Sequence, residues 1–143
     1  MPTDDDQVER FVFDACALIA YLNDEPGADK VEELLDQAQQ NHIQLYVNAV
    51  NIYEVFYDCL KRDAAMARQL VDEIYGLAIT VVESLDRPLM DAAGGFKVSY
   101  RVSLADSLAL GLAQELNARL VSTDHHEMDQ IDRDGKMQFH WLR

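Results

Sequence analysis

Four acidic residues stand at positions from which their carboxylates could act on one reaction. They are Asp14, Glu54, Asp106 and Asp124. Two carboxylates about 4 Å apart repel each other by about 1 kcal/mol in water and by about 4 kcal/mol at an effective dielectric of 20. If these groups converge, they must take up protons, spread apart or bind a cation.

An all-carboxylate site suits a hard divalent ion, Mg²⁺ or Mn²⁺, rather than zinc. Such ions clamp phosphate oxygens and generate a nucleophile from bound water, so the predicted chemistry is hydrolysis of phosphodiesters. Plainer roles are also open. Asp14 and Asp124 could cap the segments that follow them, and Asp106 fits a capping box that begins at Ser103. Glu54 could be a solvated helix residue.

An alternation of strands and helices is needed to bring these acids together. The apolar patterns predict strands at residues 10–14, 43–47, 79–82 and 119–122, with an edge strand at 138–141. They predict helices at residues 15–21, 28–40, 48–60 and 64–77, one from Pro88 that Gly94-Gly95 interrupts or ends, and one from Ser103. No hairpin turn signal separates the strands, which indicates a parallel sheet of an α/β domain. Ligands of such sheets bind beyond the carboxyl ends of the strands, where all four acids are expected.

Composition narrows the classes of protein that remain. The 143 residues predict a single domain over 1–143, with residues 1–9 as a flexible acidic tail. A hydrophobic content of 49% excludes general disorder, no apolar run approaches the roughly 18 residues of a membrane span, and two cysteines are too few for a disulfide framework. A cytoplasmic setting is therefore expected.

The charge is strongly acidic, with 12 Lys and Arg against 26 Asp and Glu and a net charge of −14. This balance argues against a protein that coats nucleic-acid phosphates. It leaves a small-molecule enzyme, a partner of basic proteins, or a carboxylate cluster that binds metal.

The ordered acids and the residues around them resemble the PIN-domain family, and within it the VapC-like toxins of type II toxin–antitoxin systems. The segments that carry the resemblance are Phe-Val-Phe-Asp14-Ala-Cys-Ala-Leu-Ile-Ala-Tyr-Leu, Asn51-Ile-Tyr-Glu54, Ser103-Leu-Ala-Asp106-Ser-Leu-Ala-Leu and Leu120-Val-Ser-Thr-Asp124. The resemblance extends from Phe11 to about Gln138. It implies a three-layer α/β/α sandwich around a mainly parallel sheet of four to five strands.

The resemblance also implies an activity: cleavage of RNA by a Mg²⁺- or Mn²⁺-dependent endoribonuclease. The catalytic and metal-binding residues would then be Asp14, Glu54, Asp106 and Asp124, with Ser122 steadying the site through a hydrogen bond. The family commonly forms homodimers, and the toxin hypothesis adds a small antitoxin whose basic segment covers the pocket. Lys97 and Arg101, four residues apart and shortly before Asp106, are the predicted contacts to RNA phosphate.

Two departures from the family pattern keep alternatives open. Ala15 and Cys16 stand where the family often has a hydroxyl residue, and His126 stands where many members carry a further acid, for which Glu127 or Asp129 could substitute. His125 and His126 are expected at an exposed turn. One alternative is a PIN-fold protein that does not cleave and acts through protein partners. A phospho-accepting receiver domain ranks last, because strand one supplies a single acid and strand three ends without an aspartate.

Overall fold

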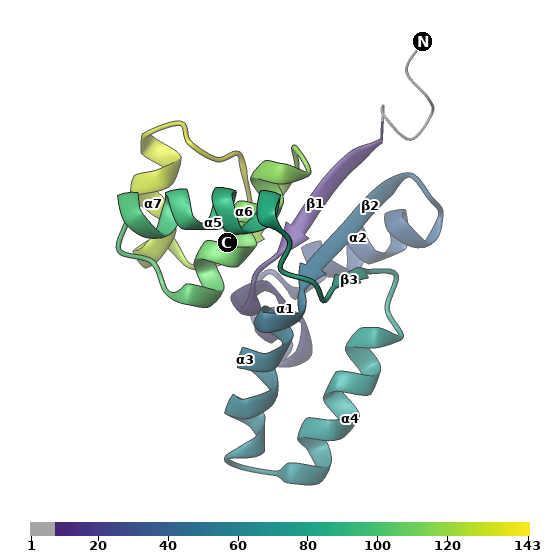
Figure 1. Cartoon of the computed structure of the whole chain (residues 1–143). Helices are drawn as coiled ribbons and strands as arrows, with labels where there is room; N and C mark the ends of the chain where they lie inside the picture. Colours follow the sequence, from purple (N-terminus) through teal and green to yellow (C-terminus); the bar gives the residue numbers. More distant parts are fainter. Residues whose placement is uncertain (1–7) are drawn as a thin grey trace.

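The computed structural model describes residues 8–143, which form a five-stranded sheet. The strands are β1 (Glu9–Phe13), β2 (Ile43–Asn48), β3 (Thr80–Val82), β4 (Arg119–Ser122) and β5 (Phe139–Trp141). Their order across the sheet is β3-β2-β1-β4-β5, and every neighbouring pair is parallel. The predicted parallel sheet is confirmed, with β1 at its centre (Figure 1).

Seven helices join and cover the strands of the described chain. They are α1 (Ala15–Leu22), α2 (Ala28–Gln39), α3 (Ala49–Leu60), α4 (Ala64–Tyr75), α5 (Arg87–Ser99), α6 (Leu104–Glu115) and α7 (His125–Arg133). Side chains of a strand alternate between the two faces of the sheet. Accordingly, Phe11 and Phe13 pack into a core with α1, α2 and the inner sides of α3 and α4, while Val12 packs into a second core with α5, α6 and α7. The predicted three-layer sandwich is confirmed.

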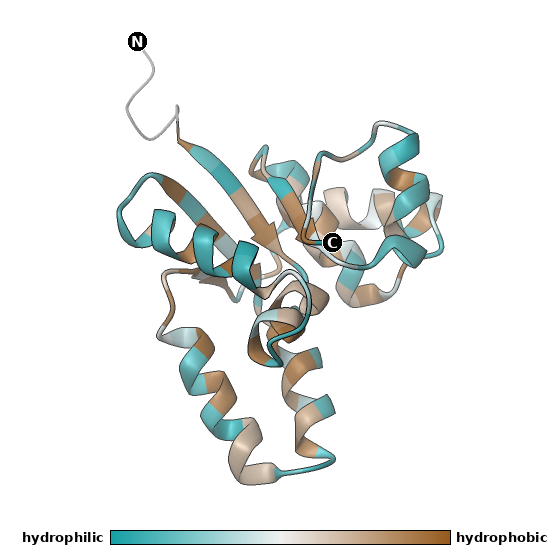
Figure 2. Cartoon of the chain, turned by 180° about the vertical axis from the view of Figure 1, so that it is seen from behind, coloured by the Kyte–Doolittle hydropathy of each residue, from teal (hydrophilic) through white to brown (hydrophobic). Residues whose placement is uncertain are grey.

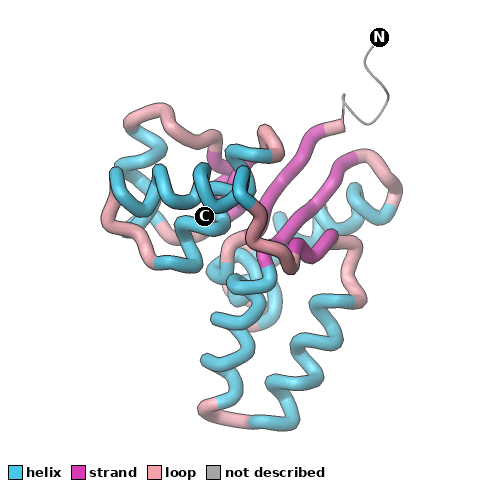
Figure 3. Tube along the Cα trace, in the orientation of Figure 1, coloured by secondary structure: helices cyan, strands magenta, loops and turns pink. Residues whose placement is uncertain are grey.

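The helices α3 and α4 form an antiparallel pair that extends beyond the carboxyl ends of the strands (Figure 1). A short loop joins them at the far end of this projection (Figure 3). Asn48 caps α3 by accepting a hydrogen bond from the backbone N–H of Val50 at 2.9 Å, as the sequence predicts. By contrast, α2 lies against the sheet and presents a hydrophilic outer side, which includes Glu32 and Asp36 (Figure 2).

The predicted break at Gly94-Gly95 is wrong, because α5 continues through both glycines to Ser99. Neither glycine has a positive φ, and each costs a helix only about 1 kcal/mol relative to alanine. Close packing of α5 on α6 outweighs that cost. The approach is so tight that a Cβ on Gly111 of α6 would lie 2.6 Å from the backbone nitrogen of Ala93 in α5.

The expected turn at His125 and His126 is also wrong, since these residues begin helix α7. Only Met128 and Ile131 of that helix are buried, and two apolar positions are too few to produce a clear helical period. At the other end of the chain, Glu9 was assigned to the tail but is the first residue of β1. Val8 of the expected tail directly precedes β1, and residues 1–7 lie outside the described residues. Within residues 8–143, no helix combines the length and apolar character that crossing a bilayer requires.

Candidate functional site

Asp14 lies at the carboxyl edge of the sheet, between the ends of β1 and β4. Pairing of Phe13 with Val121 places these two strand ends side by side. The Asp14 side chain is fully buried, and its Oδ1 accepts a hydrogen bond from the backbone N–H of Ala17 at 2.8 Å. The hydroxyl of Ser122 donates to its Oδ2. Both oxygens of Asp14 are therefore held in a fixed orientation.

Asp124 is tied to the same position through Ser122. Its backbone N–H donates to the Ser122 hydroxyl at 3.0 Å. Its Oδ1 caps α7 by accepting from the backbone N–H of Glu127 at 3.1 Å. The capping roles that the sequence left open for Asp14 and Asp124 are both present, yet they use only part of each carboxylate. A cap at this edge also aims the carboxylate beyond the strand ends.

Asp106 and Glu54 come from the helices α6 and α3. Asp106 is in the first turn of α6, nearly buried, and its backbone N–H donates to the Ser103 hydroxyl at 3.0 Å. Glu54 is in the second turn of α3 and is half-buried. Between these helices, Asn51 Nδ2 donates to the carbonyl oxygen of Ala105 at 3.4 Å.

The pKa values of these acids show that they lie within reach of one another electrostatically. The pKa of Asp14 is raised to about 7, mainly by burial; the hydrogen bonds from Ser122 and Ala17 oppose the rise, and the charges of Asp106 and Asp124 contribute to it. The four acids predicted from the sequence therefore share one edge of the sheet with mutual effects on protonation.

Asp106 links the remaining acids to this group. Its pKa is raised to about 6, mainly by burial; the hydrogen bond with Ser103 opposes the rise, and the charges of Asp124, Glu54 and Glu127 contribute to it. Burial also raises the pKa of Glu54. Burial and mutual repulsion thus make ionisation of these carboxylates unfavourable, and the hydrogen bonds that they accept offset only part of that cost.

A hard divalent cation fits the chemistry of this donor set, which consists of carboxylate oxygens. Among residues 8–143, no group of three or more His, Cys, Asp or Glu side chains is arranged so that it could hold a metal ion. Carboxylates that repel one another spread apart, and a cation would draw them together. The residues present therefore fit Mg²⁺ or Mn²⁺ through their chemistry.

Of the two further acids that the sequence offers, Glu127 and not Asp129 has a charge that acts on Asp106. The charge of Glu127 raises the pKa of Asp106. Asp129 is instead paired with His125, whose Nδ1 lies 2.7 Å from its Oδ1. The sequence could not decide between Glu127 and Asp129 because their side-chain directions depend on α7. That helix has too few apolar residues to be predicted from their spacing.

Cys16 lies beside the acids, at a position where a hydroxyl was expected from the resemblance. The pKa of its thiol is raised to about 12, mainly by burial; the charges of Asp14, Asp124 and Asp106 contribute to the rise, and a hydrogen bond with Thr123 opposes it. The thiol is therefore neutral near pH 7 and is a poor nucleophile.

The two cations predicted to contact RNA lie before α6. Lys97 Nζ donates to the carbonyl oxygen of Val102 at 2.7 Å, so its ammonium group holds the loop between α5 and α6. Arg101 is exposed. Within the described part of the chain, no hydrogen bond or ion pair joins either side chain to the acids.

The sequence matches the family model for the PIN domain over residues 11–134. The chain belongs to the PIN-domain family. That match spans the four acids and all of the sheet except β5 and the first residues of β1. No curated protein matches the sequence.

Solved structures share the fold of this PIN-domain chain at low sequence identity. DNA-bound VapBC from Salmonella typhimurium has a TM-score of 0.73 and 13% identity, covering 95% of this chain and 100% of that one. VapBC2 from Rickettsia felis, bound to a promoter DNA fragment, has a TM-score of 0.69 and 13% identity, covering 92% and 98%. A toxin–antitoxin complex from Klebsiella pneumoniae has a TM-score of 0.62 and 15% identity, covering 84% and 91%.

The strand order of this PIN domain excludes the receiver-domain hypothesis. That chemistry needs groups from the ends of strands one, three and five to meet. Here β3 and β5 lie at opposite edges of the sheet, and β1 lies between them. The neighbours of β1 are β2 and β4, and the side chains that act on Asp14 accordingly come from β4, from the residues that follow it and from α6, the helix that leads into it.

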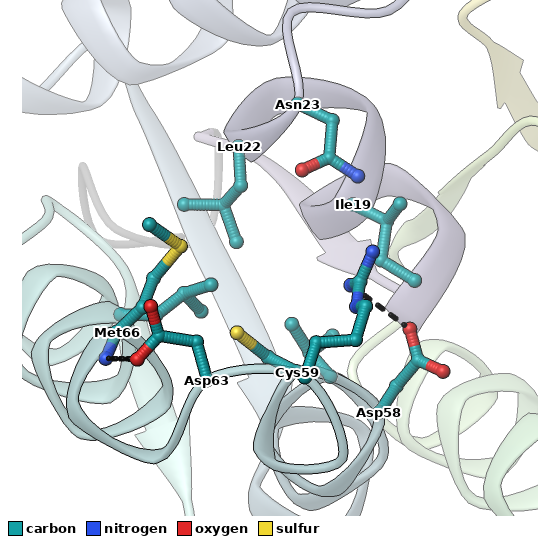
Figure 4. A pocket seen from close by; sticks show the side chains of 10 residues that line it. Ile19, Leu22, Asn23, Asp58, Cys59, Asp63 and Met66 are labelled. Atoms are coloured by element: carbon teal, nitrogen blue, oxygen red, sulfur yellow. Dashed lines mark hydrogen bonds and ion pairs between the residues drawn. The ribbon is translucent and has the colours of Figure 1, made fainter.

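A groove of about 270 Å³ separates α1 from the α3–α4 pair of the PIN domain (Figure 4). Its walls combine apolar side chains with a polar rim at one end. The lining residues are Ile19, Leu22, Val55, Cys59, Met66, Leu70, Asn23, Asp58, Arg62 and Asp63. In the rim, Arg62 pairs with Asp58 at 3.5 Å, and Asp63 caps α4.

Proposed function

We propose that this PIN-domain protein is a divalent-metal-dependent endoribonuclease and the toxin of a toxin–antitoxin pair. The observation that carries the proposal is the set of mutually coupled carboxylates beyond the ends of β1 and β4. Membership of the family and the fold shared with chains of VapBC complexes support the same assignment.

Each residue of the site has a proposed role. Asp14, Asp106 and Asp124 would hold Mg²⁺ or Mn²⁺, and Ser122 keeps Asp14 in the orientation that this needs. When bound, the ion would supply positive charge to phosphate oxygens and a nucleophile at neutral pH. Glu54 binds the ion or accepts a proton from the attacking water. Its raised pKa moves it toward the range in which a carboxylate is an effective general base.

RNA is the proposed substrate despite the net charge of −14. Arg101 is the better placed of the two predicted phosphate contacts, because it is exposed, whereas Lys97 is bonded to the carbonyl of Val102. Weak general attraction for polyanions favours a nuclease that selects its RNA by local contacts near the acids.

The proposed partner is a small antitoxin with a basic segment, in a cytoplasmic setting. The apolar groove between α1 and the α3–α4 pair would accommodate one side of an amphipathic segment, and the acids at its rim favour basic residues beside it. We also propose a homodimer, for which the exposed Tyr53 and Tyr57 of α3 provide apolar surface.

Cleavage of RNA by the purified protein tests the proposal. Labelled RNA is incubated with Mg²⁺, with Mn²⁺ and with a chelator, beside the variants Asp106→Asn and Asp36→Asn. We expect cleavage that needs metal and falls at least about 100-fold in Asp106→Asn, since this removes a charge that binds the ion. Asp36 lies exposed on α2, so its variant is the matched control.

A second function is favoured by the lack of a preformed group of metal ligands among residues 8–143. In that case the PIN fold would act through protein partners alone. Absence of both cleavage and Mn²⁺ binding by the wild type, together with tight binding of a partner, would favour it over the nuclease.

A further inference from the structure

Asn51 joins the two helices that carry Glu54 and Asp106. Its side chain is fully buried. Its Nδ2 donates to the carbonyl oxygen of Ala105, the residue directly before Asp106, at 3.4 Å. Glu54 lies one helical turn after Asn51, on the same side of α3. A single side chain therefore connects the backbone segments of two of the acids.

The other polar atom of the Asn51 side chain has no partner. Within residues 8–143, Oδ1 of Asn51 is the buried side-chain oxygen that lacks a hydrogen bond. The orientation of the amide is fixed, because turning it over would place Oδ1 against the Ala105 carbonyl, which is also an acceptor. A buried acceptor without a donor lowers the stability of the fold. A role in folding therefore does not explain this oxygen.

We propose that Asn51 is a positioning residue of the acid site. Its amide group sets the spacing between Glu54 and Asp106, and its Oδ1 accepts a hydrogen bond from the water shell of a divalent ion held by the carboxylates. The inference rests on the proposed function. Water molecules around such an ion are strong donors, and acceptors in the outer shell fix ligand geometry and increase metal affinity.

Asn48 provides a comparison on the same helix. It is also buried, but its Oδ1 accepts from the backbone N–H of Val50 at 2.9 Å. Its oxygen is satisfied by the start of α3 itself. Asn48 therefore acts in folding, and a change there should alter stability without altering metal affinity.

The decisive variant is Asn51→Leu, which keeps a similar volume and removes both polar atoms. We expect the metal-free variant to melt at the same temperature as the wild type or higher, because an unsatisfied acceptor is gone. We expect its affinity for Mn²⁺, measured by titration calorimetry, to fall about 10-fold or more. A purely structural role predicts the opposite pattern, with lower stability and unchanged affinity.

Two further variants complete the test. Asn51→Ala removes the same two polar atoms, so its affinity for Mn²⁺ should fall as in Asn51→Leu, while the cavity that it leaves lowers its melting temperature. Asn48→Ala should lower the melting temperature through the lost cap and leave Mn²⁺ affinity unchanged.

The outcomes separate this inference from the proposed function. If the wild type does not bind Mn²⁺, both are wrong. If the wild type binds Mn²⁺ and Asn51→Leu binds it equally well, only the role of Asn51 is overturned. Should Asn51→Leu fail to fold, Asn51→Ala decides: a reduced Mn²⁺ affinity supports the role of the amide, and an unchanged affinity overturns it.

Discussion

At the scale of single residues, the site combines groups that stabilise the fold with groups that destabilise it. The hydrogen bonds to Asp14 from Ser122 and Ala17 order its carboxylate. Burial nevertheless raises the pKa of Asp14 to about 7, because the ionised form is poorly solvated. The same residue thus caps a helix and carries a charge that the folded chain accommodates at a cost in stability.

This cost gives Asp14 a predictable effect on pH dependence. Its pKa is about 7 in the folded protein and near the ordinary 3.8 when unfolded, so the folded state binds the proton more tightly. Its favourable contribution is complete below about pH 4 and is lost as the pH rises through 7. The metal-free protein should therefore become less stable between these values.

Asp14→Asn removes this titration and retains a side chain that caps α1. Relative to the wild type, we expect the variant to gain stability as the pH rises from 5 to 8, by at least about 1 kcal/mol, or about 2–4 °C in melting temperature. Thermal melts in chelator across this pH range measure the difference, with Asp36→Asn as the control. Parallel curves for Asp14→Asn and the wild type would contradict the assigned pKa.

At the scale of elements, the tight contact between α5 and α6 determines what its glycines tolerate. Gly94 and Gly95 have nothing within 4 Å of an added Cβ, whereas Gly111 meets the Ala93 backbone. Gly95→Ala should stabilise the protein by about 0.5–1 kcal/mol through helix propensity. Gly111→Ala should destabilise it by about 1–3 kcal/mol through overpacking. Urea unfolding measures both, and equal effects in the two variants would refute the packing argument.

The elements also show which patterns in the sequence were informative. β1 followed by Asp14, and Asn48 followed by α3, were predictable because an apolar run and a capping residue are local signals. The helix α7 was not, because its only two buried residues are Met128 and Ile131. Gly95 was misinterpreted because α6 packs against α5 strongly enough to keep a helix that local propensity weakens.

The candidate site also contains residues with a local signal in the sequence and one residue without such a signal. The four candidate acids could be proposed because each follows a strand or lies in the first two turns of a helix that begins at the same edge. The buried amide of Asn51 has no such signal, apart from its position one turn before Glu54. Its burial against Ala105 depends on the packing of α3 on α6. Asn51 and Ala105 are 54 positions apart in the sequence, so no local pattern predicts that they meet.

At the scale of the whole molecule, the α3–α4 pair exposes aromatic surface on the side away from the groove that it forms with α1. A hollow of about 520 Å³ there is lined by Tyr53, Phe56 and Tyr75, together with Arg68 and Asp72. Tyr53 is 60% exposed. Exposed apolar surface of this kind is typical of a protein–protein contact.

We expect a second copy of the chain to cover this surface. Sedimentation velocity should give a dimer for the wild type and a monomer for Tyr53→Glu, because a charge there would be buried without a partner. Met90→Glu, which places the same charge on the exposed side of α5, should remain a dimer. Dimers in all three proteins would place the contact elsewhere, and a monomeric wild type would overturn the dimer itself.

The pairing of β1 with β4 has a consequence for the order of events during synthesis. The hydrogen bond from Ser122 to Asp14 joins residues 108 positions apart, and β4 must lie beside β1 before it forms. A ribosome that has made only α1 to α5 carries a chain with Asp14 and Glu54 but without Asp106 or Asp124. Contacts of such long separation form late in folding. The acid cluster therefore assembles only when translation has passed β4, so an incomplete nascent chain lacks two of the four acids on which the proposed cleavage of RNA depends.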